Sequence, residues 1–279
     1  MKLNIVGIIA RLDSSEAIRA AKKITYSLLE RNVKPILEEK LAEEIGWKGE
    51  ARSIEKMDVD LVIVIGGDGT VLRTARLLSK LKTPILAVNA GTLGFLSEVD
   101  VDGLNEAIDL LMKNAYTVEQ CSRIKAVING EEMGDALNEI TIITEEPVKV
   151  LNLIVKKNDE TIFSGRADGL IIATKTGSTA YALSAGGPII DPELDVFVIV
   201  LLCPLKIYQR PLVIPSTARL SILIAEDGSN ALVVADGQVR RKASIGSVVT
   251  IEKSGNKSYF IRFGKSFYKR LRERMIKDV

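Results

Sequence analysis

The 279-residue chain contains no histidine, and this absence removes several kinds of active site. A Ser-His-Asp triad, a Cys-His pair and a histidine-ligated metal centre all need an imidazole. Any general base must therefore be a carboxylate, lysine, tyrosine or cysteine. The only cysteines are Cys121 and Cys203, so the chain also lacks a disulfide framework and a set of zinc ligands. We expect a reducing, cytoplasmic environment.

Long apolar runs and an excess of charge are missing as well. The longest apolar stretch, Val196–Leu205, has about half the length of a membrane helix. The run Leu3–Ala10 has no small-residue cleavage site after it, which indicates a buried strand rather than a signal peptide. Basic and acidic residues number 38 and 36. We therefore expect neither nucleic acid nor a membrane as partner.

Residues 3–113 alternate between strand-like and helix-like segments. Leu3–Ala10 and Leu61–Ile65 are continuous apolar runs, as strands buried on both faces are. After the first, Asp13 and Glu16 are spaced like a capping box. Further strands are expected at Lys34–Leu37 and Pro84–Val88, and helices at Thr70–Leu81 and Leu104–Met112. This alternation predicts a parallel, doubly wound sheet over residues 1–115.

From residue 116 onward the pattern changes to short segments separated by turn sequences such as Asn129-Gly130 and Asp236-Gly237. The expected strands include Ile124–Ile128, Glu139–Thr144, Val148–Lys156, Thr161–Ser164 and Gly169–Ala173. Helical spacing returns only at Ser178–Ala185 and Phe267–Ile276. These patterns predict a β-rich domain over 116–262 and a C-terminal helix within 263–279, whose docking stays open.

The turn Gly66-Gly67-Asp68-Gly69-Thr70 follows a buried strand and opens a helix. Ligands of open α/β sheets bind at such strand ends, where free amides of the helix N-terminus favour anions. A carboxylate beside phosphate is repulsive unless it binds Mg²⁺ or removes a proton, and phosphoryl transfer needs both. The structural alternative is a tight turn with Asp68 as N-cap.

Two more segments carry chemistry in this reading. Asn89–Leu96 is a second glycine-containing loop at a strand end, in which Phe95 stacks on a base, closes a pocket or is a core side chain. Residues 167–188 are dense in glycine and small hydroxyl side chains, which suit a ribose or base edge. Ser178 has no histidine to activate it as a nucleophile. Asn138 and Glu139 precede an alternating run. A role in ligand binding and a purely structural role in a turn explain this pair equally well.

Together these segments resemble the NAD kinase family in content and in order. The matching sequences are GGDGT at 66–70, GTLGFL at 91–96, LNEITI at 137–142 and DGLIIATKTGSTAYALSAGGPI at 168–189. RPLVIP at 210–215 and DGQ at 236–238 also look like later motifs of the family. GGDGT alone also occurs in lipid and sugar kinases, so the segment 168–189 is the specific one.

The resemblance implies transfer of the ATP γ-phosphoryl group to the 2′-hydroxyl of the adenosine ribose of NAD, with Mg²⁺ or another divalent cation. It also implies a Rossmann-like first domain, a β-sandwich-like second domain, and a homodimer or homotetramer that shares the NAD site between subunits. Asp68 matches the family's base. The candidate NAD- and nucleotide-binding residues are Gly67, Asp68, Gly69, Thr70, Arg73, Gly94, Phe95, Asn138, Glu139, Arg166, Asp168, Thr176, Ser178, Thr179, Ala180, Tyr181 and Ser184.

Two positions depart from the family pattern. Lys175 stands where proline is expected and would add positive charge near phosphate, and Leu205 stands where many members have histidine. The alternatives are a lipid or sugar kinase that shares the GGDGT turn, and a dinucleotide sensor without catalysis. A sensor would not need Asp68. Donor choice between ATP and polyphosphate is not encoded in any of these motifs.

Overall fold

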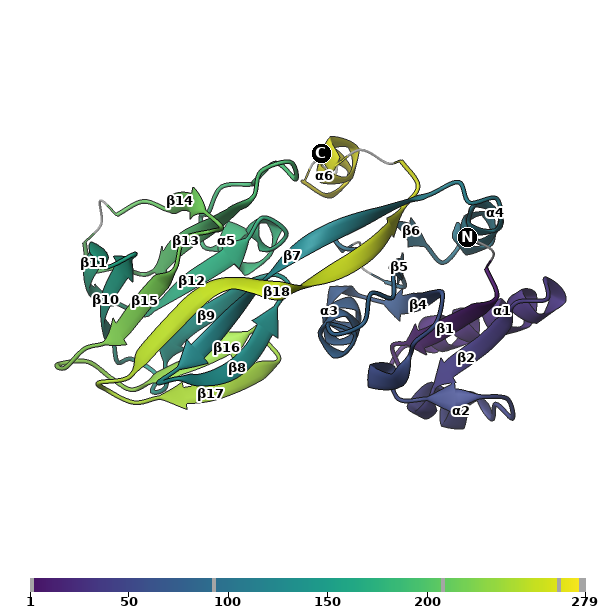
Figure 1. Ribbon diagram of the computed structural model, residues 1–279, viewed down its shortest axis with the longest axis horizontal. Coiled ribbons are helices and arrows are strands. Elements are labelled where there is room, and N and C mark those ends of the chain that lie inside the picture. Colours follow the sequence, from purple (N-terminus) through teal and green to yellow (C-terminus); the bar gives the residue numbers. More distant parts are fainter. Residues whose placement is uncertain (1–2, 92–93, 207–208, 265–266, 276–279) are drawn as a thin grey trace. The chain divides into compact units, whose positions relative to one another are not determined.

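The computed structural model describes residues 3–91, 94–206, 209–264 and 267–275 (Figure 1). The chain divides into two compact units, Met1–Cys121 with Lys257–Val279, and Ser122–Asn256. The sequence instead suggested a division at 116 and 262. The difference arises because two long paired strands, β7 (Thr117–Ile128) and β18 (Val248–Arg262), each run from one unit into the other. Strand patterning carries no signal for such a crossing.

The first unit contains a parallel sheet in the order β3-β2-β1-β4-β5, with the end of β18 beside β5. Its strands are β1 (Ile5–Ala10), β2 (Lys34–Glu38), β3 (Ala51–Arg52), β4 (Leu61–Gly66), β5 (Ile85–Asn89) and β6 (Val99–Asp100). Its helices are α1 (Ser15–Glu30), α2 (Glu39–Ile45), η1 (Ile54–Lys56), α3 (Asp68–Leu77), α4 (Leu104–Met112) and α6 (Phe267–Met275). The predicted parallel, doubly wound sheet is confirmed.

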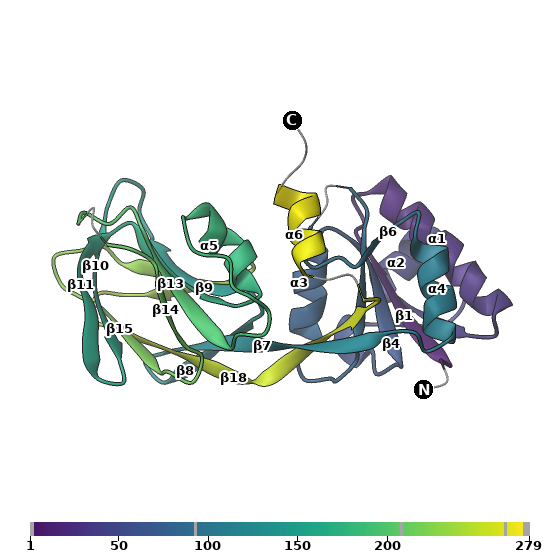
Figure 2. The same cartoon turned by 90° about the horizontal axis from the view of Figure 1, so that it is seen from above.

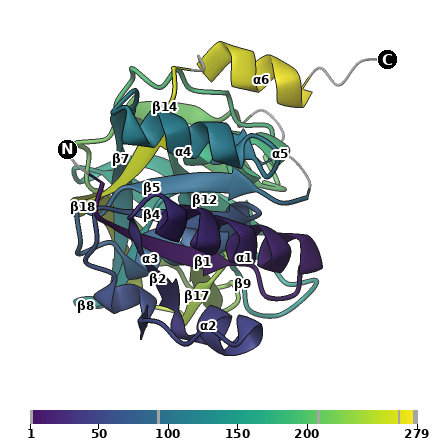
Figure 3. The ribbon, with the colours of Figure 1, turned by 90° about the vertical axis from the view of Figure 1, so that its right-hand side faces the viewer.

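Helices cover both faces of this sheet, which explains why its strands are apolar throughout. Figure 2 shows α1 and α4 on one face and α3 on the other, and Figure 3 views the unit from the α1 and α4 side. The predicted stripe of α1, which includes Ala17, Ile24 and Leu28, is buried in one cluster with Ile8 and Ile63 of the sheet. Amphipathic helices at period 3.6 therefore supply the core of this unit.

The second unit is built from two antiparallel layers. One layer has the strand order β14-β13-β12-β9-β16-β17, and the other has β11-β10-β15-β18, with β7 paired to β18 and β8. The bounds are β8 (Glu131–Ala136), β9 (Glu139–Thr144), β10 (Leu151–Lys157), β11 (Glu160–Ala167), β12 (Gly169–Thr174), β13 (Val196–Leu202), β14 (Leu212–Pro215), β15 (Leu220–Ile224), β16 (Ala231–Ala235) and β17 (Val239–Ala243). The β-rich prediction is confirmed.

The core of the second unit lies between these layers, as in a β-sandwich. Ile140, Ile142 and Val233 from one layer pack with Leu153 and Ile222 from the other. On the outer face of the first layer, the short helix α5 (Tyr181–Ser184) packs on β12 and β13. The outer face of β9 and β16 contributes to a pocket described below.

Three details of the helices differ from expectation. Helix α3 spans Asp68–Leu77 and not Thr70–Leu81. Ser14, not Asp13, caps α1, because its Oγ accepts the amide of Ala17 at 3.3 Å while Asp13 pairs with Arg11. The single helix expected at Ser178–Ala185 is instead η2 (Gly177–Thr179) followed by α5, because Ala180 has non-helical φ −103° and ψ −129°.

The C-terminal helix α6 groups with the first unit. Arg270 of α6 lies 3.4 Å from Oε2 of Glu98. The last residue expected for this helix, Ile276, lies outside the described residues. No helix in the described part of the chain is long and apolar enough to span a membrane.

Candidate functional site

The glycine-rich turn connects the buried strand β4 to α3. Gly66 must be glycine because a Cβ there would lie 2.8 Å from Oγ1 of Thr70 and 3.0 Å from Cβ of Arg11. Gly67 is the N-cap of α3, and neither Gly67 nor Gly69 has an atom within 4 Å of a would-be Cβ. The alternative of Asp68 as N-cap is wrong. The two glycines thus place no side chain in front of the helix N-terminus, so a ligand can approach it.

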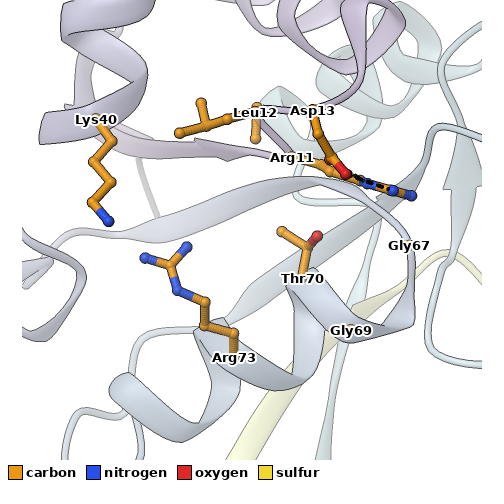
Figure 4. Close-up of a pocket in the computed structure, with 9 residues that line it drawn as sticks. Arg11, Leu12, Asp13, Lys40, Gly67, Gly69, Thr70 and Arg73 are labelled. Carbon is orange, nitrogen blue, oxygen red and sulfur yellow. Dashed lines mark hydrogen bonds and ion pairs between the residues drawn. The ribbon is translucent and has the colours of Figure 1, made fainter. Parts of the chain in front are cut away.

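A pocket of about 530 Å³ opens beside this turn (Figure 4). Its lining residues are Ala10, Arg11, Leu12, Asp13, Lys40, Gly67, Gly69, Thr70 and Arg73. Three cationic side chains surround it, and Arg73 is held by an ion pair of 2.7 Å to Glu38, whose side chain is buried. Positive charge and a helix N-terminus in one pocket favour a phosphate-bearing ligand.

Asp68 is the first residue of α3, and its carboxylate is bound by the loop after β5. Oδ2 accepts the amide N–H of Phe95 at 2.8 Å, and Oδ1 accepts that of Leu96 at 3.2 Å. A Cβ on Gly94 would lie 2.0 Å from Oδ1, so glycine is required for this approach. The first unit therefore brings the predicted residues Asp68, Gly94 and Phe95 together and holds the carboxylate in one orientation. Thr92 and Leu93 of the same motif lie outside the described residues.

In the second unit, the segment 137–139 is fastened to the turn after β12. Thr174 Oγ1 donates to the carbonyl of Leu137 at 2.6 Å, and its amide donates to the carbonyl of Asn138 at 2.8 Å. Gly177 packs so closely that a Cβ would lie 2.1 Å from the carbonyl oxygen of Asn138. The structure thus joins two motifs that are separate in sequence, and it places Asn138 and Glu139 beside the 177–181 segment.

Glu139 and Asp236 form a buried carboxyl pair. Asp236 accepts the amides of Leu137, Asn138 and Glu139 at 2.7, 2.8 and 3.2 Å. Burial raises the pKa of Asp236, although those three amides favour its ionised form. Burial and the adjacent Asp236 together raise the pKa of Glu139 to about 8, against the amide of Tyr181. Glu139 is therefore mostly protonated at neutral pH.

This carboxyl pair lies at a pocket of about 370 Å³ on the outer face of β9 and β16. The lining residues are Glu139, Thr141, Ile143, Tyr181, Leu232, Val234, Asp236, Gly237 and Arg240. Oε2 of Glu139 and Oδ1 of Asn138 have no hydrogen-bond partner among the described residues. Buried polar atoms in that state are costly unless a ligand or water binds them. An apolar wall with a few polar groups suits a nucleoside.

The hydroxyl groups of the loop after β12 are used within the loop. Ser178 is buried, donates to the carbonyl of Lys175 at 2.7 Å and accepts the amide of Ile190 at 3.1 Å. Thr179 donates to the carbonyl of Thr176 at 3.2 Å. These bonds shape the turn, and nucleotide binding by these side chains stays a prediction. The exposed members of the set are Tyr181 and Ser184, while Thr176, Thr179 and Ala180 are half-buried.

Arg166 and Asp168 do not lie with these residues. Arg166 and Asp168 precede β12, whereas the 175–181 segment follows it. Because β12 is an extended strand of six residues, the segments at its two ends lie about 20 Å apart. Both side chains are exposed, and Asp168 accepts a hydrogen bond from the thiol of Cys203. The structure therefore divides the predicted binding residues of the second unit into two groups.

Comparison with known proteins places both units in one family. Residues 6–116 match the ATP-NAD kinase N-terminal domain, and residues 137–263 match the ATP-NAD kinase C-terminal domain. The chain belongs to the ATP-NAD kinase family. It is 40% identical over 272 residues to the NAD kinase of Methanothermobacter thermautotrophicus, covering 97% of this chain and 96% of that relative.

One solved structure supports the family assignment, and a second supports the fold. An NAD kinase from Archaeoglobus fulgidus in complex with ATP matches with a TM-score of 0.77 and 28% identity, over 96% of each chain. Yeast NADH kinase complexed with NADH matches with a TM-score of 0.91 over 99% of this chain and 88% of that chain. At 22% identity, this second likeness speaks for the fold alone.

The two departures from the ATP-NAD kinase pattern have different surroundings. The amine of Lys175 donates to the carbonyl of Pro192, so its charge is tied to the backbone of the second unit. Leu205 is 64% exposed, and its amide donates to the carbonyl of Arg166 at 3.1 Å. Leu205 therefore lies near the group of Arg166 and Asp168, not near Glu139.

Sequence reasoning missed several residues of both pockets. Arg11, Asp13 and Lys40 line the first pocket but come from segments that carry no motif. Asp236 was noted only as part of a late motif, yet it organises the backbone of 137–139. The Asp-Gly turn sequence within that motif gave no indication of this structural role. The contacts that give it a role span almost a hundred residues of sequence.

Proposed function

We propose that this protein transfers the γ-phosphoryl group of ATP to the 2′-hydroxyl of the adenosine ribose of NAD, giving NADP and ADP. The observation that carries this proposal is family membership over both units. The geometry agrees with it, because the first unit holds a cationic pocket at a helix N-terminus and the second holds a pocket suited to a nucleoside. A lipid or sugar kinase would not account for the match of residues 137–263 to the ATP-NAD kinase C-terminal domain.

Asp68 is the residue we propose as general base. It takes the proton of the 2′-hydroxyl while that oxygen bonds to the γ-phosphorus and the bond to ADP breaks. The hydrogen bonds from Phe95 and Leu96 fix its carboxylate, and a fixed base reduces the reorganisation needed during transfer. No imidazole is present in the chain to take this role.

The second unit would bind the adenosine part of NAD. Asn138 offers a free carbonyl oxygen, and protonated Glu139 can donate a hydrogen bond that a carboxylate cannot. Tyr181 lines the same pocket and offers a ring for stacking. These assignments follow the family resemblance and the unsatisfied oxygens of Asn138 and Glu139, of which Glu139 lines the pocket.

A divalent cation, Mg²⁺ in our proposal, would arrive with ATP. The described residues contain no group of three or more carboxylate or cysteine ligands able to hold a metal ion by themselves. Mg²⁺ commonly uses substrate phosphates, waters and only one or two carboxylates, so a closed set of protein ligands is not required. The cation would neutralise charge on the transferred phosphoryl group.

We further infer a cytoplasmic homodimer or homotetramer. The separation of Asp168 and Arg166 from Tyr181 favours an assembly in which a second subunit supplies one of the two groups. Ile143, Leu232 and Val234 give the pocket face an apolar character suited to an interface. Neither Cys121 nor Cys203 forms a disulfide, which is compatible with the reducing compartment we propose. Light scattering on the purified protein measures the assembly size.

The decisive experiment is a matrix of donors and acceptors. The purified protein is incubated with ATP or inorganic polyphosphate, with Mg²⁺, and with NAD, NADH, a diacylglycerol or a hexose. We expect NADP from NAD and ATP. Product only from a lipid or sugar, or NAD binding without turnover from any donor, would contradict the proposal.

The base assignment has its own test in Asp68→Asn. Loss of a general base lowers turnover by about 10²–10⁴. Full activity in this variant would refute the role of Asp68 while leaving the overall reaction intact.

A further inference from the structure

The loop that holds Asp68 is itself held by an arginine from the far end of the chain. Leu96 donates its amide to Oδ1 of Asp68, and its carbonyl oxygen accepts Nη1 of Arg262 at 3.2 Å. The amide and the carbonyl group of Leu96 thus connect Asp68, the proposed base, to Arg262, the last residue of β18. The separation in sequence is 166 residues between Leu96 and Arg262.

Arg262 is fixed by carboxylates of its own. Its Nε donates to Oε2 of Glu119 at 2.6 Å, and its Nη1 lies 3.3 Å from Oε2 of Glu98. Its side chain is 11% exposed and that of Glu98 is 1% exposed. Glu98 also accepts the amide of Phe263 at 2.9 Å and Nη1 of Arg270 at 3.4 Å. Every residue of this network belongs to the first unit.

The buried guanidinium group of Arg262 forms a rigid anchor with the carboxylates of Glu119 and Glu98, because its planar shape fixes the directions of several hydrogen bonds at once. Lysine at this position would keep the charge but could not reach Glu119, Glu98 and the carbonyl of Leu96 in the same geometry. The amides of Phe95 and Leu96 can orient Asp68 only while the loop stays in place, and the carbonyl held by Arg262 belongs to one of these two residues.

We propose that Arg262 is a positioning residue for catalysis: by holding the carbonyl of Leu96, it keeps the loop amides on the carboxylate of Asp68. Glu98 completes the anchor, and Arg270 connects it to α6. The catalytic side of this inference rests on the proposed function of Asp68, whereas the effect on the loop does not.

The first test measures the loop directly. Amide hydrogen exchange of a peptide spanning 94–98 is compared in wild type, Arg262→Lys and Arg272→Lys. Arg272 is exposed on α6 and serves as the matched control. We expect faster exchange in Arg262→Lys and unchanged exchange in Arg272→Lys. Equal exchange in all three proteins overturns the proposal whatever reaction the enzyme catalyses.

The second test is a double-mutant cycle with Asp68→Asn. Arg262→Lys should lower kcat by about 10- to 100-fold, because small displacements of a catalytic group have effects of this size, while KM for NAD and ATP changes little. Added to Asp68→Asn, it should lower kcat no further, because its effect runs through Asp68. An equal loss in both backgrounds, or a raised KM with unchanged kcat, contradicts the proposal.

If Arg262→Lys does not fold, Glu98→Gln takes its place in both tests with the same criteria, because it removes the charge that anchors Arg262 and Arg270. A wild-type protein that forms no NADP would refute the proposed function, and the exchange measurement would still decide whether Arg262 holds the loop.

Discussion

Each unit places one glycine against a functional segment, but what that glycine touches differs. In the first unit, a Cβ on Gly94 would meet the carboxylate of Asp68, the end of a side chain that can turn away. In the second, a Cβ on Gly177 would meet the carbonyl oxygen, carbonyl carbon and Cα of Asn138, which are backbone. The first contact controls the direction of a reactive group, and the second controls the packing of two segments.

The carboxyl groups of Asp68 and Glu139 also differ between the two units. Asp68 receives two amide hydrogen bonds in a half-buried position beside the phosphate pocket. Glu139 is buried next to Asp236 and keeps one oxygen without a partner. The first unit thus fixes the orientation of Asp68, the proposed base, whereas the second leaves an oxygen of Glu139 available for the proposed ligand.

Among variants that keep the Asp68 and Glu139 side chains, the largest effect is expected for Gly94→Ala. Because the methyl group displaces the Asp68 carboxylate, kcat should fall by about 10², while the melting temperature stays close to that of wild type. Steady-state kinetics and thermal unfolding measure the two quantities. The control is Gly103→Ala, where the Cβ would be 3.3 Å from its nearest neighbour. Unchanged turnover in Gly94→Ala would remove the steric argument.

Gly177→Ala should act on stability and on NAD binding rather than on chemistry. Because backbone must shift, we expect the free energy of unfolding to fall by about 1–3 kcal/mol. We also expect Kd for NAD to rise. Denaturant unfolding and calorimetric titration measure these changes, with Gly255→Ala, which has open space, as control. If kcat at saturating NAD fell while Kd stayed constant, the distinction between the units would fail.

Glu139 should make stability depend on pH in the direction opposite to an ordinary ion-paired carboxylate. With a pKa of about 8 in the folded protein and an ordinary value of 4.5, the native state binds the extra proton between these limits. The free energy of unfolding therefore falls as pH rises from about 5 to 8, by at most about 1.4 kcal/mol per pH unit. Thermal unfolding of Glu139→Gln should lack this slope, and parallel curves for both proteins would contradict it.

The smallest effect is expected for Lys175→Met. The lysine amine is engaged by the carbonyl of Pro192, so its removal should change KM for ATP by less than about twofold, within the range of ordinary surface changes. Initial rates at varied ATP measure it. A large increase in KM would mean that the lysine leaves Pro192 to bind phosphate.

Much of this fold follows from local pattern. Apolar runs gave β1 and β4, helical spacing gave the buried stripe of α1, and the bounds expected for α4 and β9 are those observed. The phosphate turn was recognised because its glycines follow a buried strand directly. Such features depend on residues within a few positions of each other, which a sequence displays.

Other parts depend on contacts that local pattern does not contain. The passage of β7 and β18 between units, the bonds of Asp236 to 137–139, and the hold of Arg262 on Leu96 each join segments about a hundred or more residues apart. Ser178 shows the converse case, since its hydroxyl looks available in sequence but is consumed by Lys175 and Ile190.

The central claim is that turnover depends on Asp68 in one unit and NAD binding on Glu139 in the other. Its most direct test measures kcat and Kd for NAD in Asp68→Asn and Glu139→Ala from parallel preparations. We predict that Asp68→Asn lowers kcat by about 10²–10⁴ with Kd near that of wild type, and that Glu139→Ala chiefly raises Kd. Loss of NAD affinity in Asp68→Asn that equals its loss of turnover would contradict the account.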